Sequence, residues 1–386
     1  MKKYYLMAPG PTPVPQNVLL AMAQPIIHHR TPEYEALFIE VRAGLKRLFQ
    51  TRHDVIPFTS SGTGALEAAV VNTLSAGDTV VLFRAGKFAE RWEEICRAYG
   101  VTVVPVSAPF GHTIPAERIA DALRRHPAPK AVLMQHSESS TGVLHDVESV
   151  AAVTRSTDTI LIVDAVSSLG IADLRMDAWG VDVVVAGSQK GLMLPPGLSF
   201  CALSDKAWDH VKGARLPKYY FDLALEAQAL RKNEAHFTPA VSIMVGLREV
   251  LRMIEAEGLP SAFRRHERLA RATRGGVEAL GLDLFAQTRP SPSLTAVVAP
   301  RGVDGEKIAA TYSGSHNITI AGGHGEMKGG IFRLGHMGYV AEFDVLTALA
   351  ALEQVLHELG QPVDFGAAVG AAQKIFSAEG ASAPVS

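Results

Sequence analysis

The chain of 386 residues has few cysteines, little net charge and no long apolar segment, and each shortage argues against a class of protein. Its two cysteines, Cys96 and Cys201, are too few for a disulfide framework, so we expect a reducing compartment, the cytoplasm. A formal net charge of −2 gives no reason to expect nucleic acid or an anionic membrane as a partner. Apolar runs such as residues 160–163 are far shorter than the roughly 20 residues that a membrane-spanning helix needs.

Hydrophobic residues make up 47% of the sequence, which is enough for a large core, and the length favours two domains. Alternate prolines near the start prevent a helix, so residues 1–15 should form an extended arm. The pattern of the sequence changes after Phe237, where a long helix is expected at 239–257 that ends at Gly258 and Pro260. We therefore predict a large domain at 16–257 and a smaller C-terminal α+β domain at 258–386, whose end beyond Ile375 should fray.

Short runs of apolar and β-branched residues alternate with helix-length segments through the predicted large domain. The expected strands lie at 80–83, 101–106, 131–134, 159–163, 181–185 and 198–202. This alternation is typical of an α/β fold, in which a mainly parallel sheet carries helices on both faces. The smaller domain should contain a strand at 294–298 and another that leads into Phe332.

Two polar residues follow apolar strand patterns and indicate carbonyl chemistry. Lys190 precedes a glycine and three apolar residues, so partial burial would leave its amine neutral enough to attack an aldehyde. Asp164 ends the strand at 159–163, at the carboxyl edge where α/β sheets bind ligands, and an acid there can pair with a cationic ring nitrogen. Each residue also has an ordinary explanation, because most lysines are solvated and an aspartate after a strand often caps a helix.

A turn of small residues joins a short strand to an alanine-rich helix and is suited to a phosphate group. Ser61, Gly62 and Thr63 can point backbone amides at an anion, and the helix dipole adds to the attraction. The dinucleotide-binding pattern Gly-x-Gly-x-x-Gly is incomplete, because Glu67 occupies the third glycine position. An ordinary helix start with hydroxyl caps remains the alternative. A reactive lysine, a ring-pairing acid and a phosphate turn together indicate a pyridoxal phosphate enzyme.

Five motifs occur in order, with the sequences SGTGALEA, HSESSTGVL, VDAVSSLG, GSQKGL and FRLGHMG. In this order they resemble the class V aminotransferases, and most closely the alanine–glyoxylate and serine–pyruvate branch. The resemblance begins with PGPTPVP in the N-terminal arm and covers nearly the whole chain. It implies a fold-type I pyridoxal phosphate transferase, with a mainly parallel seven-stranded sheet in the large domain.

The same resemblance implies the reaction and the assembly. A small amino acid, alanine or serine, would donate its amino group to pyridoxal 5′-phosphate, and glyoxylate or pyruvate would accept it in a ping-pong exchange. The active sites would lie at the subunit interface of a homodimer. No metal ion is expected, because the histidines lack metal-ligand spacing with cysteines or acids.

The matching positions imply a role for each residue. Lys190 would hold the cofactor as a Schiff base and then move the substrate proton, while Asp164 would keep the ring nitrogen protonated. The phosphate would bind Ser61, Gly62, Thr63, Gln189 and, across the dimer, Thr238 of the partner subunit. Phe88 would stack on the ring, with Ser139 near the ring oxygen. The substrate carboxylate would bind Arg333, Ser168 and the backbone of Gly10.

One departure from the family pattern leaves the substrate open. Ala235 stands where animal glyoxylate enzymes have a phosphate-contacting tyrosine, and the lost hydrogen bond would weaken cofactor binding by about 1 kcal/mol. Transamination of (S)-ureidoglycine with glyoxylate is therefore an alternative. A lyase or desulfurase of the same fold is a further alternative, but it needs a reactive cysteine on a mobile loop. A non-enzymatic interaction subunit would purify without the colour of a bound cofactor.

Overall fold

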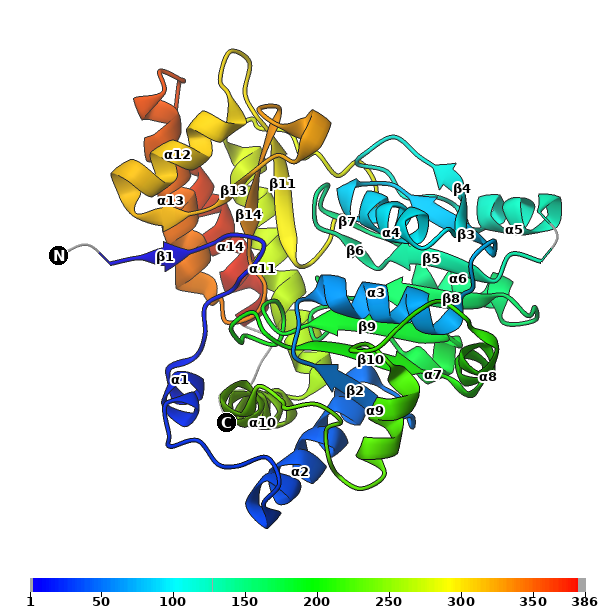
Figure 1. The fold of residues 1–386 in the computed structure, drawn as a ribbon. Coiled ribbons are helices and arrows are strands. Elements are labelled where there is room, and N and C mark those ends of the chain that lie inside the picture. Colours follow the sequence, from blue (N-terminus) through cyan, green and yellow to red (C-terminus); the bar gives the residue numbers. More distant parts are fainter. Residues whose placement is uncertain (1–2, 127, 381–386) are drawn as a thin grey trace.

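A seven-stranded sheet forms the centre of the molecule in the computed structural model, which describes residues 3–126 and 128–380 (Figure 1). In spatial order its strands are β2 (Val55–Phe58), β10 (Ser199–Leu203), β9 (Val183–Gly187), β8 (Ile160–Asp164), β5 (Ala131–Gln135), β3 (Thr79–Arg84) and β4 (Thr102–Ser107). β10 is antiparallel to both neighbours, whereas the run from β9 to β4 is parallel. The predicted α/β fold with a mainly parallel sheet is confirmed.

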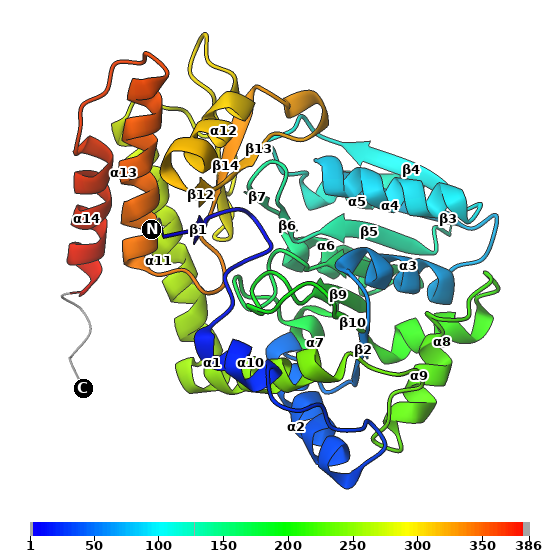
Figure 2. The same ribbon diagram turned by 60° about the vertical axis from the view of Figure 1, so that its left-hand side comes forward.

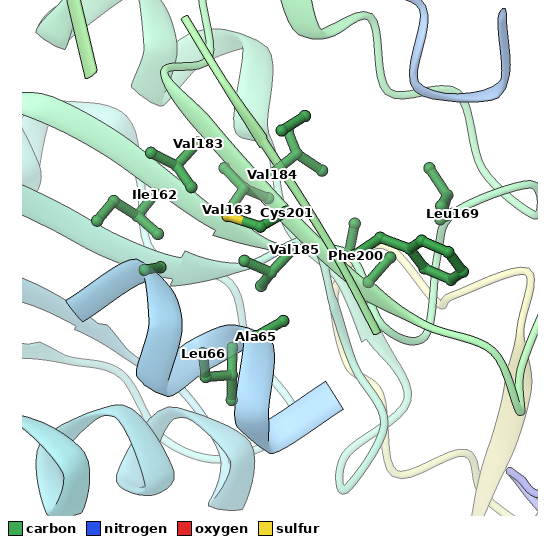
Figure 3. Packing of buried hydrophobic residues seen from close by; sticks show 14 of the residues in the cluster. Ala65, Leu66, Ile162, Val163, Leu169, Val183, Val184, Val185, Phe200 and Cys201 are labelled. Carbon is green, nitrogen blue, oxygen red and sulfur yellow. The ribbon is translucent and has the colours of Figure 1, made fainter. Parts of the chain in front are cut away.

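Helices cover both faces of this sheet, which explains why its central strands are almost wholly apolar. Every residue of β5, β8, β9 and β10 is buried. Helix α3 (Gly62–Thr73) packs against β9 and β10, and Figure 3 shows its Ala65 and Leu66 close to Val185. Burial of a valine or leucine side chain contributes roughly 1.5 to 3 kcal/mol, so the sheet is a rigid platform for a site at its edge.

The remaining helices of this part are α1 (Gln16–Met22), α2 (Pro32–Phe49), α4 (Lys87–Ala98), α5 (Ala116–Arg125), α6 (Val147–Thr154), α7 (Met176–Trp179), α8 (Asp205–Gly213), α9 (Leu223–Leu230) and α10 (Val241–Glu257). A short antiparallel hairpin of β6 (Ser137–Glu138) and β7 (Val143–Leu144) follows β5. The start of α2 is specified locally, because the Thr31 side chain accepts a hydrogen bond from the Tyr34 amide and Pro32 begins the helix.

The C-terminal part combines a small antiparallel sheet with a layer of helices. Its three strands are β11 (Leu294–Val298), β14 (Ile331–Gly335) and β13 (Ala321–Gly322), and its helices are α11 (Leu259–Ala279), α12 (Gly305–His316), α13 (Glu342–Glu358) and α14 (Ala367–Gly380), with a short 3₁₀ turn η1 (Gly325–Met327). The N-terminal strand β1 (Tyr5–Leu6) pairs in parallel with β12 (Ile318–Thr319), so the first and the last described elements, β1 and α14, both belong to this part (Figure 2).

The predicted strands and helices correspond to observed ones, with three differences. The strand predicted at 181–185 is found at Val183–Gly187, two residues later. Pro260 does not simply follow a helix, because α11 begins at Leu259 and has this proline in its first turn. The end predicted to fray beyond Ile375 is helical up to Gly380, and the last six residues lie outside the described part.

Buried hydrophobic side chains form two large clusters. One extends from Val18 to Ile254, and the other joins Met7 to side chains between Leu269 and Phe376. The domain boundary at 257/258 stays a prediction. Within residues 3–126 and 128–380, the helices are all too short or too polar to span a bilayer.

Candidate active site

The predicted acid and lysine meet at the carboxyl edge of two neighbouring parallel strands. Asp164 is the last residue of β8 and pairs with Val185 of β9, while Lys190 follows the end of β9 by three residues. Both line a cavity of about 230 Å³. The structure brings eight of the predicted residues together around it, namely Ser61, Gly62, Thr63, Phe88, Ser139, Asp164, Gln189 and Lys190. A ligand site at this edge is the usual arrangement of α/β sheets.

Lys190 has the electrostatics of an activated amine. Burial lowers its pKa to about 8, the positive charge of Arg333 acts in the same direction, and Asp164 opposes them. Its Nζ donates a hydrogen bond to the carbonyl of Pro9 in the N-terminal arm. A Cβ at Gly10 would overlap the Lys190 side chain, so the arm requires glycine where it crosses the lysine. An amine with this pKa is partly neutral near pH 7 and can act as a nucleophile.

Asp164 is a buried carboxyl suited to hold a cation. Burial raises its pKa to about 6, whereas the Val166 amide, which donates to Oδ1 at 2.8 Å, and the charges of Arg91 and Lys190 lower it. A bound cation would add to these lowering effects and favour the ionised form. Asp164 is therefore suited to pair with a protonated ring nitrogen inside the cavity.

The turn before α3 provides an anion site. Gly62 and Thr63 are the first residues of the helix, where amides lack intrahelical partners, and Ser61 makes no side-chain capping bond. A Cβ at Gly62 would lie 2.7 Å from Val166 Cγ2, so the close packing of this turn needs glycine. The buried Oε1 of Gln189 has no hydrogen-bond partner among the described residues. The free amides of Gly62 and Thr63 fit a phosphate-bearing cofactor, and Gln189 would donate to it from Nε2 after rotation of its amide group, because Oε1 can only accept.

Phe88 lies in the first turn of α4 and lines the cavity. The ring of His324 meets it edge-on, with centroids 6.1 Å apart. An aromatic side chain that lines the cavity is available to stack on an aromatic cofactor.

Arg91 also lines the cavity and was missed by the sequence reasoning. Its Nη1 lies 3.4 Å from Thr63 Oγ1, and its guanidinium lies 5.0 Å from the Phe88 centroid, so neither neighbour neutralises its charge. The spacing gave a partial indication, because Arg91 follows Phe88 by three residues and therefore shares its face of a helix. The sequence does not show, however, that this face lies next to the phosphate turn.

The predicted carboxylate-binding residues lie just outside the cavity lining. Arg333 on β14 is 4% exposed, donates from Nη1 to the Ser139 carbonyl at 2.7 Å and from Nε to the Gly322 carbonyl at 2.9 Å. Burial lowers its pKa to about 10, which leaves it charged at neutral pH. The buried Oγ of Ser168 has no hydrogen-bond partner in residues 3–126 and 128–380.

Thr238 is the predicted residue that a single chain does not bring to Lys190. It lines a different pocket, together with Ala235 and Phe237. Its role across a dimer interface stays a prediction. In the part of the chain that the structure describes, no three His, Cys, Asp or Glu side chains gather in a way that could hold a metal ion.

The chain is similar to known proteins along nearly its whole length. A family model described as aminotransferase class-V matches residues 4–333. The soluble hydrogenase small subunit of a Synechococcus strain is 46% identical over 97% of this chain and 99% of its own length. The L-aspartate–glyoxylate aminotransferase of Paracoccus denitrificans is 39% identical over 96% of this chain and 95% of its own. The solved structure of ureidoglycine–glyoxylate aminotransferase from Bacillus subtilis has a TM-score of 0.93 and 30% identity, covering 98% of this chain and 99% of that one.

Proposed function

This chain belongs to the aminotransferase class V family, and from that premise we propose that it transfers an amino group from alanine or serine to glyoxylate or pyruvate. We further propose pyridoxal 5′-phosphate as its cofactor and a ping-pong order of half-reactions. The observation that carries the proposal is the meeting of Lys190, Asp164 and an anion-binding helix start in one cavity. Glyoxylate is favoured as the acceptor because the relatives from Paracoccus and Bacillus are both named as glyoxylate aminotransferases.

Some of the side chains in the cavity would bind the cofactor, and Lys190 would also transfer a proton. Pyridoxal phosphate, when bound, supplies a ring that withdraws the electron pair left on the substrate Cα. Lys190 would bind the cofactor aldehyde and, once released, carry the proton from the substrate Cα. Asp164 would hold the proton on the ring nitrogen by its negative charge. The amides of Gly62 and Thr63 would bind the phosphate.

The substrate carboxylate is assigned to Arg333, with Ser168 and the backbone of Gly10 as smaller contributors. A guanidinium can form two parallel charge-assisted bonds to a carboxylate, which fixes the Cα above the reacting amine. We also propose a homodimer in which Thr238 of the partner subunit completes the phosphate site. A cytoplasmic location is the proposal that the two free cysteines support.

The proposal is tested by mixing purified protein, loaded with pyridoxal phosphate, with single amino donors and following the loss of the cofactor absorbance in one turnover. Alanine or serine should bleach the band within seconds, and glyoxylate should restore it, as a ping-pong order requires. (S)-Ureidoglycine is included because it is the alternative donor. If neither alanine nor serine bleaches the band, the assignment to this branch of the family is wrong.

A desulfurase fits the cysteines poorly. Cys96 and Cys201 are both buried, and burial raises the pKa of Cys96 to about 12 and that of Cys201 still further. A thiol with such a pKa is protonated at neutral pH and is a weak nucleophile.

An acidic donor such as aspartate is the second candidate, and Arg91 is the observation that favours it. We expect Arg91→Gln to lower kcat/KM for aspartate by about 10- to 100-fold, since a lost charge-assisted bond costs about 1.5–3 kcal/mol, while alanine turnover is unchanged. Steady-state kinetics with both donors measure this difference. Arg97→Gln, an exposed arginine of the same helix, is the matched control. An equal loss with both donors, together with weaker cofactor binding, would assign Arg91 to the phosphate and remove the acidic candidate.

A further inference from the structure

Glu138 is a fully buried carboxyl group that does not line the cavity. It lies on β6 between two parts of the molecule that the proposed function uses, the start of α4 and the strand that carries Arg333. We propose that Glu138 is a positioning residue that holds both the ring-stacking Phe88 and the carboxylate-binding Arg333 in their working orientations. This inference rests on the proposed function, which assigns those roles to Phe88 and Arg333.

One oxygen of Glu138 fixes the start of α4. Its Oε2 accepts hydrogen bonds from the amides of Phe88 at 3.1 Å and Ala89 at 3.3 Å. Amides in the first turn of a helix have no partner inside the helix, and the residue at the cap position, Gly86, has no side chain to serve them. A Cβ at Gly86 would overlap the Glu138 side chain, so glycine is what allows the carboxyl group to reach the helix. Glu138 therefore caps a helix from a distant strand and sets the direction in which Phe88 enters the cavity.

The other oxygen fixes the turn that orients Arg333. Oε1 accepts from the Ser140 amide at 3.0 Å and from Ser140 Oγ at 2.6 Å. Ser139 lies between Glu138 and Ser140 in the chain, and its carbonyl accepts a hydrogen bond from Arg333 Nη1 at 2.7 Å. The orientation of this carbonyl is thus set by its neighbours on both sides. Ser140 Oγ also accepts from the Lys87 amide at 3.0 Å, which ties the same turn to α4.

The charge of Glu138 serves the same arrangement. Burial raises the pKa of Glu138, whereas its hydrogen bonds from Ser140 and Ala89 act in the opposite direction. All four of its partners are donors, so only the carboxylate form satisfies every one of them. Burial lowers the pKa of Arg333, and the negative charge of Glu138 opposes that effect. A neutral side chain of the same shape would keep the packing but lose one pair of hydrogen bonds and this charge.

Glu138→Gln is the variant that separates positioning from packing. Glutamine has the same shape, but its amide nitrogen must face either the two α4 amides or the Ser140 amide, and all three of these can only donate. We expect KM for every amino donor to rise about tenfold, because the Arg333 fork loses its fixed partner. We also expect the circular dichroism of the bound cofactor to weaken and, in the cofactor-free protein, hydrogen exchange at residues 86–92 to accelerate.

Two single-role variants calibrate these readouts. Arg333→Lys should raise KM without changing the cofactor dichroism, and Phe88→Leu should change the dichroism with little effect on KM. Glu138→Gln is expected to reproduce both effects together. Glu94→Gln, an exposed glutamate of the same helix, is the matched control. Ser140→Ala removes the bond from Ser140 Oγ to Oε1 and the bond that Oγ accepts from the Lys87 amide, but it keeps the bond from the Ser140 amide to Oε1. It should produce the KM effect in milder form and serves if the glutamine variant does not fold.

The possible results separate a failure of the proposed function from a failure of the positioning role of Glu138. A wild-type protein that binds pyridoxal phosphate but transaminates none of the donors refutes the proposed function, whatever the variants do. A wild-type protein that is active, beside a Glu138→Gln variant with lower thermal stability but unchanged KM and dichroism, overturns the positioning role alone. Joint changes in KM, dichroism and hydrogen exchange support it.

Discussion

Lys190→Ala should reduce transamination by at least about 10⁴-fold, the largest effect we expect from any single substitution. General base catalysis alone contributes about 10²- to 10⁴-fold, and the variant also loses covalent attachment of the cofactor. Burial lowers the pKa of Lys190 to about 8, which makes this amine available for attack near neutral pH. Single-turnover kinetics with alanine measure the loss in rate.

Reduction with borohydride gives a second, independent measurement. Peptide mapping of the reduced wild-type protein should find the cofactor attached at Lys190, and the alanine variant should yield no such peptide. Lys130→Ala is the control, because this exposed lysine precedes β5 at the opposite edge of the sheet. An adduct at any other lysine, or a Lys190→Ala variant that retains more than a few per cent of the rate, would contradict the assignment.

The sequence predicted Lys190 and Asp164 because parallel strands bring their carboxyl ends to one edge. Once 159–163 and 181–185 are recognised as strands, alternation of strands and helices forces both ends to the same side of the sheet. The phosphate turn was predictable for the same reason, since α3 must begin where β2 ends. Local pattern and topology were sufficient for these residues.

Arg91 and Glu138 could not be found in this way. Arg91 lies on a helix, and its direction depends on how α4 is rotated against the sheet, which spacing along the chain does not determine. Glu138 belongs to a motif that the sequence reasoning noted, yet its partner Phe88 lies 50 positions earlier. Contacts of that kind are set by packing between elements, and no periodicity records them.

The C-terminal helix α14 shows a different limit of prediction from the sequence. A run rich in alanine, serine and glycine near the end of a chain predicts fraying, because terminal segments are poorly ordered unless packing holds them. In the structure α14 packs along α11, and Phe376 is buried in the C-terminal cluster. Tertiary burial therefore holds the helix as far as Gly380, which the sequence near the chain end does not reveal.

Asp164→Asn should slow transamination by about 10²- to 10³-fold, the second largest effect. Asparagine keeps the shape, and its Oδ1 can still accept from the Val166 amide, but it has no charge to hold a proton on the ring nitrogen. Cofactor affinity should change little, because the phosphate contacts and Lys190 remain. Asp158→Asn, an exposed aspartate just before the other end of β8, is the control.

The same variant should be more stable than the wild-type protein when both lack cofactor, with a difference that grows between about pH 4 and 6 and is complete above that range. Burial raises the pKa of Asp164 from 3.8 to about 6, so the unfolded chain loses this proton first as the pH rises. The folded state then becomes progressively less stable between about pH 4 and 6, by up to about 3 kcal/mol at higher pH. Asparagine is neutral throughout, so the Tm of Asp164→Asn should exceed that of the wild type at pH 8 and approach it at pH 4. A variant less stable than the wild type at pH 8 would show that attraction to the charges of Arg91 and Lys190 outweighs the cost of burial. In that case the ionised Asp164 would stabilise the folded protein instead of destabilising it.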